Sequence, residues 1–76
     1  MTFHVGIYRN GKADLIKHIA RNRGDVSKLS FYCASVGFPV AAAVVFCMEE
    51  FPEKSEELLR KLEVLKEFYG YTEVIE

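Results

Sequence analysis

The sequence has few cysteines, histidines and glycines, which are common in zinc sites and phosphate-binding loops. Its 76 residues include two cysteines, Cys33 and Cys47, whose spacing matches no zinc-binding pattern and which have no histidine nearby in the chain. The five glycines form no phosphate-binding loop, because Asn10-Gly11-Lys12 offers too little glycine and lysine for one. We therefore expect no metal site and no cofactor, and we expect both thiols to be buried and reduced.

Segments that direct a chain to or across a membrane are not apparent either. The residues from Met1 to Val5 show no basic start followed by an apolar run, so no signal peptide is expected. The stretch from Leu29 to Met48 is free of charge and long enough to span a membrane, but Gly37 and Pro39 interrupt it. A β-hairpin explains this stretch better than a spanning helix, and we expect a cytoplasmic protein with no membrane partner.

Histidines and paired carboxylates, the usual acid and base groups of enzymes, form no catalytic pattern. His4 and His18 have no neighbours in the sequence that suggest a triad or a metal set. The pairs Glu49-Glu50 and Glu56-Glu57 are more simply solvated helix charges than acid–base dyads. We therefore expect a protein that is not an enzyme.

The hydrophobic periodicity predicts six elements in the order strand, helix, strand, strand, helix, strand. Alternating apolar residues indicate the strands, and apolar residues at three- and four-residue spacing indicate the helices. This order predicts a single domain over residues 1–76 with a ferredoxin-like βαββαβ fold, an α+β sandwich. Its four-stranded antiparallel sheet would carry both helices on one face. The predicted strands cover 2–8, 28–36, 40–48 and 71–75, and the predicted helices cover 11–23 and 51–70.

Apolar residues make up half of the chain, a high share for a domain this short. Either the core is unusually dense or some apolar surface is left for a partner, and we favour the second explanation. The strand predicted over 40–48 has no polar residue on either face, so both faces should be covered. We expect a homodimer or a higher oligomer. The outward, partner-facing residues would be Tyr8, Tyr32, Ala34 and Val36.

Charge is divided unevenly between the two ends of the chain, although the net charge is −1. Residues 1–28 carry six lysines and arginines against two aspartates, and residues 49–76 carry nine glutamates against four lysines and arginines. The predicted first helix is therefore basic and the second acidic. The simpler explanation of this division is that each helix exposes its charged face to solvent. A basic docking face or an electrostatically paired oligomer is the functional alternative.

Binding of nucleic acid is the weaker of the partner hypotheses. RNA-recognition domains have the same element order and stack bases on aromatic residues of the sheet, where Tyr8 and Tyr32 would lie. However, the strand predicted over 40–48 has no lysine or arginine, and the whole chain is not basic. Nucleic acid is therefore not the expected partner.

The chain resembles an ACT domain, a small regulatory fold that binds amino acids, over nearly its whole length. The ligand-binding domain of Lrp/AsnC-type regulators is similar in most of the same features. The resemblance rests on Val5-Gly6-Ile7-Tyr8 followed by Gly11, on the helix from Ala13 to Ile16 that ends at Asn22-Arg23-Gly24-Asp25-Val26, on an aliphatic third strand, on Glu56 to Leu62, and on the closing residues 70–75.

The resemblance implies a function and a site. ACT-like domains bind amino acids at subunit interfaces, so it implies a non-enzymatic regulatory module that binds a small metabolite and acts on its own assembly or on a partner enzyme. The ligand would approach main-chain amides at Gly11, with Asn10, Val26 and Ser27 nearby. The alternative is a protein-interaction or nucleic-acid-binding module that uses the basic first helix and aromatic residues of the sheet.

Overall fold

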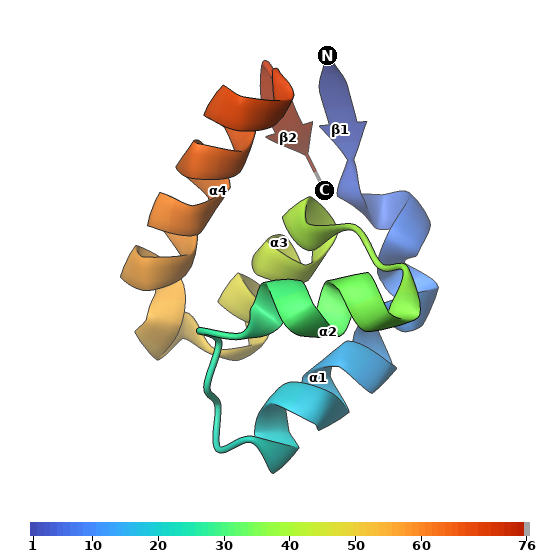
Figure 1. Cartoon of the computed structure of the whole chain (residues 1–76), viewed down its shortest axis with the longest axis vertical. Coiled ribbons are helices and arrows are strands. Elements are labelled where there is room, and N and C mark those ends of the chain that lie inside the picture. The colour runs from blue at the N-terminus through green and yellow to red at the C-terminus, as the bar shows by residue number, and fades with distance from the viewer. Residues whose placement is uncertain (76) are drawn as a thin grey trace.

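The computed structural model describes residues 1–75, and most of them are helical (Figure 1). Strand β1 is followed by the 3-10 helix η1, three α-helices, a second 3-10 turn η2, a fourth α-helix and strand β2. The bounds are β1 Thr2–His4, η1 Val5–Gly11, α1 Lys12–Arg21, α2 Leu29–Val36, α3 Val40–Glu50, η2 Pro52–Lys54, α4 Ser55–Tyr69 and β2 Glu73–Ile75.

The predicted ferredoxin-like sandwich with a four-stranded antiparallel sheet is wrong. Among residues 1–75 the only sheet has two strands, and β1 and β2 run parallel with Phe3 opposite Val74. The segments 28–36 and 40–48, predicted to form the central hairpin, contain α2 and α3 instead. The protein is therefore a small helical bundle whose two ends are joined by a short pair of strands.

Helix α3 shows why the periodicity was misleading. A short run that is apolar on all sides fits a buried strand and a buried helix equally well. Ala41-Ala42-Ala43 favours the helix, because alanine has the highest helix propensity. Six of the eleven residues of α3 are buried. Other elements pack against this helix on several sides and cover its apolar residues. The same lack of polar residues predicted a strand that is covered on both faces.

Both predicted helices are present, and each buries apolar residues spaced four positions apart. Helix α1 buries Leu15 and Ile19, and α4 buries Leu58 and Leu62. The helix predicted over 51–70 does end at Gly70, which adopts the left-handed conformation with φ of 68°. The spacing of apolar residues was sufficient to predict these two helices because each has one buried side and one exposed side.

The predicted terminal strands are shorter than expected. In the first, predicted over 2–8, the extended part ends at His4, and η1 begins at Val5. In the last, predicted over 71–75, the strand is Glu73–Ile75. The backbone N–H of Thr72 also donates a hydrogen bond of 2.8 Å to the carbonyl of Met1, which extends the contact between the two segments.

Helix α3 lies at the centre of the core, and α1, α2 and α4 pack around it (Figure 1). None of the residues from 1 to 75 that are buried is polar or charged. The core is therefore built by hydrophobic contact alone. Its largest fully buried side chains are Phe46, Leu15, Ile19, Leu29, Leu58, Val5, Val26 and Val44.

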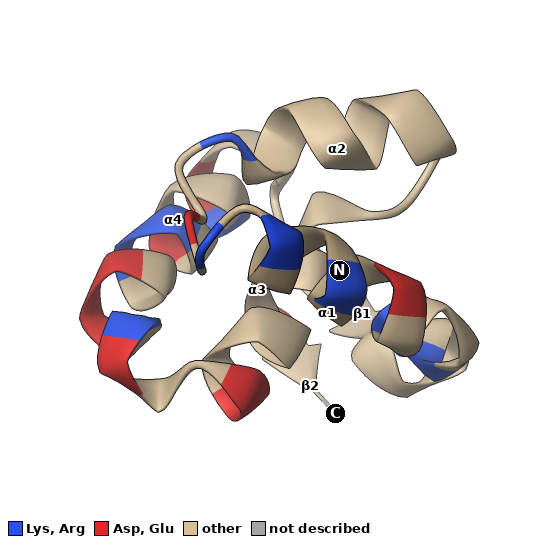
Figure 2. Ribbon diagram, turned by 90° about the horizontal axis from the view of Figure 1, so that it is seen from below, with Lys and Arg blue, Asp and Glu red and all other residues tan. Residues whose placement is uncertain are grey.

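The uneven charge of the sequence is visible on the fold. Acidic residues are concentrated on α4 and at the end of α3, whereas α1 and the link that follows it carry mostly lysine and arginine (Figure 2). Some of these opposite charges form ion pairs within the molecule. Lys12 pairs with Glu49 and Glu50, and Arg9 pairs with Glu49.

Candidate functional site

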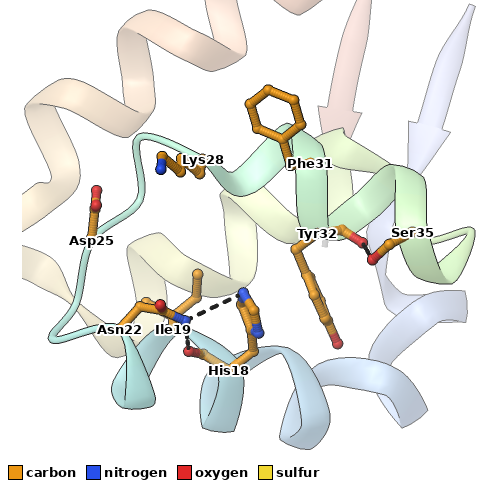
Figure 3. A pocket seen from close by; sticks show the side chains of 8 residues that line it. All are labelled: His18, Ile19, Asn22, Asp25, Lys28, Phe31, Tyr32 and Ser35. Carbon is orange, nitrogen blue, oxygen red and sulfur yellow. Dashed lines mark hydrogen bonds between the residues drawn. The ribbon is translucent and has the colours of Figure 1, made fainter.

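A pocket of about 330 Å³ lies between α1, the link after it, and α2 (Figure 3). All three segments contribute side chains, so a molecule held there would contact two helices at once. Its lining combines aromatic rings, an amide, a hydroxyl and two opposite charges. The lining residues are His18, Ile19, Asn22, Asp25, Lys28, Phe31, Tyr32 and Ser35.

The α1 wall of this pocket follows from helical spacing. His18 and Asn22 are four residues apart, which places their side chains on one face of the chain as the helix ends. The Asn22 side-chain amide donates a hydrogen bond of 2.8 Å to the His18 carbonyl, and its Nδ2 atom lies 3.4 Å from His18 Nε2. Ile19, which is buried, anchors this turn in the core. The polar groups of the wall are thus held in place by local bonds.

The α2 wall is joined to α1 by a ring stack. The imidazole of His18 and the phenol ring of Tyr32 lie with their centroids 4.3 Å apart and their planes 17° apart. Burial raises the pKa of the Tyr32 hydroxyl, so this group stays protonated at neutral pH. Ser35, one turn further on, donates a hydrogen bond of 2.8 Å to the Tyr32 carbonyl.

The link between the helices carries the two charges of the pocket, Asp25 and Lys28. The backbone N–H and the hydroxyl of Ser27 both donate to Asp25 Oδ1, at 2.9 and 2.7 Å. These two bonds, and to a smaller extent the charge of Lys28, lower the pKa of the Asp25 carboxyl. Asp25 is therefore a carboxylate at neutral pH. Val26, next to it, is buried and fixes the link to the core.

The structure does not bring the four predicted ligand residues together. Asn10 and Gly11 end η1 before α1, whereas Val26 and Ser27 lie in the link after it. Ten residues of helix separate the two pairs, a length of about 15 Å. Val26 is buried, and Ser27 serves the pocket indirectly by holding Asp25.

Gly11 has a packing role. A Cβ atom at this position would lie 2.6 Å from the Phe38 ring, closer than any side chain tolerates. The glycine therefore lets an aromatic ring of the core lie directly against the backbone at the start of α1. The ACT-like ligand approach to Gly11 would have to displace that ring.

The predicted partner-facing residues are divided between two regions. Tyr8 lies in η1, where its ring stacks on Phe3 at 5.5 Å, and Tyr32 lies in the pocket on α2. Ala34 and Val36 are exposed on α2. Neither tyrosine lies on a sheet, so the predicted aromatic sheet face does not exist among the described residues. Sequence reasoning missed His18, Asn22 and Asp25, although the four-residue spacing of the first two is a signal of a shared helix face.

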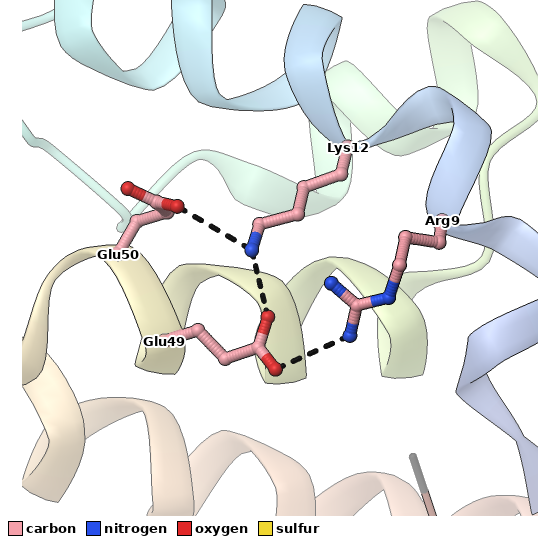
Figure 4. A network of polar contacts seen from close by, with 4 residues as sticks. All are labelled: Arg9, Lys12, Glu49 and Glu50. Carbon is pink, nitrogen blue, oxygen red and sulfur yellow. Dashed lines mark hydrogen bonds and ion pairs between the residues drawn. The ribbon is translucent and has the colours of Figure 1, made fainter.

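A second polar cluster joins η1 and α1 to the end of α3 (Figure 4). Lys12 Nζ lies 2.8 Å from a Glu49 oxygen and 3.3 Å from a Glu50 oxygen, and Arg9 Nη2 lies 3.3 Å from Glu49. The hydrogen bond between Lys12 and Glu49 raises the pKa of the lysine and lowers that of the glutamate. Arg9 Cζ also lies 5.0 Å from the centroid of the buried Phe46 ring. The four charges satisfy one another over a core ring, so this cluster is structural.

Both cysteines are free and buried, as expected from the sequence. Burial raises the pKa of the Cys33 and Cys47 thiols to about 11 in each case, so neither is a thiolate at neutral pH. Among residues 1–75, no three His, Cys, Asp or Glu side chains gather closely enough to hold a metal ion. Within the same range, every helix is too short or too polar to cross a membrane.

No family model matches the chain, and no curated protein or solved structure resembles it closely enough to count as a match. The comparisons therefore neither support nor contradict the resemblance to ACT domains. The ferredoxin-like fold that this resemblance implied is replaced by the helical fold described above. Any function has to be argued from the geometry of the chain itself.

Proposed function

We propose that this protein is a small regulatory module, without catalytic activity of its own, that binds a zwitterionic metabolite of the amino-acid class in the pocket between α1 and α2. The observation that carries the proposal is the presence of two opposite charges, Asp25 and Lys28, in the lining of a pocket walled by the His18–Tyr32 ring stack.

The chemistry of the lining suits such a ligand. The Lys28 ammonium would donate to the carboxylate of an amino acid, and the Asp25 carboxylate would accept from its ammonium group. Asp25 holds Ser27 through Oδ1, and Oδ2 has no partner among the described residues. The exposed Phe31 ring and the stacked rings offer apolar contact to the side chain of the ligand.

Regulation would follow from the position of the pocket. A ligand that bridges α1, the link and α2 binds the folded state only, so it stabilises that arrangement by about 2.7 kcal/mol at a concentration of one hundred times Kd. A partner enzyme or a second copy that binds the same arrangement would then be coupled to the ligand. We propose that the protein acts in the cytoplasm, where its reduced thiols are compatible with the redox state.

Binding of nucleic acid has less support than binding of a metabolite. The order α2, short turn, α3 is that of a helix-turn-helix, but α3 buries six residues and has no lysine or arginine. It therefore offers no surface to a DNA groove. The basic residues of α1 are the remaining argument for this alternative, and the binding they support would weaken steeply with salt.

A thermal-shift screen against the twenty amino acids, repeated at several concentrations, tests the proposal. We expect a concentration-dependent rise in Tm with one or a few of them. Lys28→Gln should then weaken the affinity by about tenfold or more, because a charge-assisted hydrogen bond is lost. Lys17→Gln is the matched control, since it removes a lysine of α1 that does not line the pocket.

Two results would contradict the proposal. One is a flat response to the whole panel up to millimolar concentrations. The other is a ligand whose affinity is the same for the Lys28→Gln variant as for the wild type, which would place the binding site elsewhere on the molecule.

A further inference from the structure

Helix α4 exposes apolar side chains that its own core does not use. Leu58 and Leu62 bury one side of the helix in the bundle. On another side, Val64 and Phe68 are 49% and 78% exposed. These two residues are four positions apart and share a helix face. A large aromatic ring left this open beside a second apolar residue indicates a surface that another molecule covers.

A groove runs beside this face, between α4 and α2. Three neighbouring hollows of about 350, 500 and 190 Å³ share lining residues and together extend from Arg60 to Tyr71. The floor is the start of α3, at Val40, and one wall is made of small residues of α2, including Ser30 and Ala34. The surface therefore presents a protruding ring next to a hollow of apolar character.

We infer that α4 pairs with α4 of a second copy of this chain, antiparallel, across a two-fold axis near Val64. A two-fold interface needs a surface that is complementary to itself, and this one carries both the protruding ring and the hollow. With a rise of about 1.5 Å per residue, Phe68 of the second copy lies level with Arg60, about 6 Å from the axis. It would enter the hollow lined by Arg60, Lys61 and Val64.

Charge complementarity selects the second copy and its direction. Arg60 and Glu67 are seven residues apart, so both flank the Val64–Phe68 face on the same side. In the antiparallel arrangement, Arg60 of each copy lies within about 1.5 Å of the level of Glu67 of the other. The two-fold axis forms this pair twice. A parallel two-fold arrangement would carry Arg60 and Glu67 of the second copy to the opposite flank of the interface, so it would form neither of these pairs.

This interface is separate from the pocket of the proposed function. The pocket lies between α1 and α2, and none of its lining residues belongs to α4. Dimerisation through α4 therefore does not depend on the binding of a metabolite in that pocket.

Sedimentation equilibrium of the full chain, from low micromolar to near-millimolar concentration, is the first test. We expect a reversible monomer–dimer equilibrium. Phe68→Asp should weaken dimerisation by about a hundredfold, because it removes an aromatic anchor and buries a charge. Leu59→Asp is the matched control. Leu59 is 46% exposed on the opposite side of α4, so this change should leave the dimer unaltered.

A charge swap tests the pairing and the direction together. Arg60→Glu and Glu67→Arg should each weaken the dimer by about tenfold, because each sets like charges together at both symmetric sites. The variant with both changes should return to within about threefold of the wild type. A wild-type chain that stays monomeric overturns the inference. A dimer that Phe68→Asp leaves intact, or whose charge variants do not restore each other, also overturns it.

Discussion

The ring of His18 and the ring of Tyr32 stack face to face, with centroids 4.3 Å apart, and so connect α1 to α2. The same stack forms the wall of the candidate pocket, which means that one contact serves both the packing of two helices and the shape of a binding site. Tyr32 was expected on an outward sheet face, and its place in this stack makes it the most informative residue to change.

Replacing Tyr32 with alanine should lower the free energy of unfolding by about 1–3 kcal/mol, because the ring contact and its buried area are lost. Tyr32→Phe keeps the ring and should remain close to the wild type. Urea denaturation at neutral pH measures both. Equal losses for the two variants would mean that the hydroxyl, and not the stack, holds the helices together.

Leu58→Ala should be among the most damaging changes in α4. Leu58 is fully buried, and removing its side chain leaves a cavity beside α3, at a cost of about 2–5 kcal/mol. In a domain this small, such a loss is a large part of the total stability. Leu59→Ala, one residue away on the exposed side, should cost less than about 0.5 kcal/mol. Thermal unfolding of the two variants tests which side of α4 faces the core. Similar losses of stability in both would contradict the buried position of Leu58 and the exposed position of Leu59.

Gly11→Ala should destabilise the fold by about 1–3 kcal/mol through overpacking, since the added Cβ would lie 2.6 Å from the Phe38 ring. The loss should be smaller in a Phe38→Leu background, where the ring is absent. A double-mutant cycle of denaturant unfolding measures this coupling. If the cost of Gly11→Ala is the same in both backgrounds, the close approach of the ring is not the reason for the glycine.

The Lys12–Glu49 pair should contribute to stability in a pH-dependent way. The folded state lowers the pKa of Glu49 below its usual value of 4.5, so its contribution is present above pH 4.5 and is lost as pH falls through the lower, folded value. Both groups are partly exposed, which limits the effect to about 0.5–1 kcal/mol. Lys12→Gln should remove it at pH 7 and flatten the stability profile below pH 4.5. An unchanged acid profile would contradict this assignment.

The buried thiols should make the fold sensitive to alkali. Because burial raises the pKa of Cys33 and Cys47 from 9.0 to about 11, their contribution is complete below pH 9.0 and is lost as pH rises through about 11. A Cys33→Ala, Cys47→Ala double variant should show a shallower decline of the urea midpoint over this range. A thiol reagent should also modify the native wild type slowly. Rapid modification at neutral pH would show that the thiols are accessible.

Prediction from the sequence succeeded where a segment has one buried side. The stripes of α1 and α4 and the glycine stop at Gly70 could be read from local spacing. It failed for α2 and α3, since a short apolar run has no period to distinguish a helix from a strand. That error also misplaced Tyr32, and with it the pocket, because side chains on a helix and on a strand point in different directions.

The amino-acid pattern was sufficient to place two amphipathic helices, to bury two thiols and to concentrate opposite charges at the two ends of the chain. Those properties depend on spacing and on hydrophobicity, which are local. Packing around α3 settled the rest: the helical state of residues 40–50, the parallel pairing of β1 with β2, and the meeting of His18, Asp25 and Tyr32 in one pocket. Each of these depends on contacts between residues distant in the sequence, and their free energy exists only once the chain is folded.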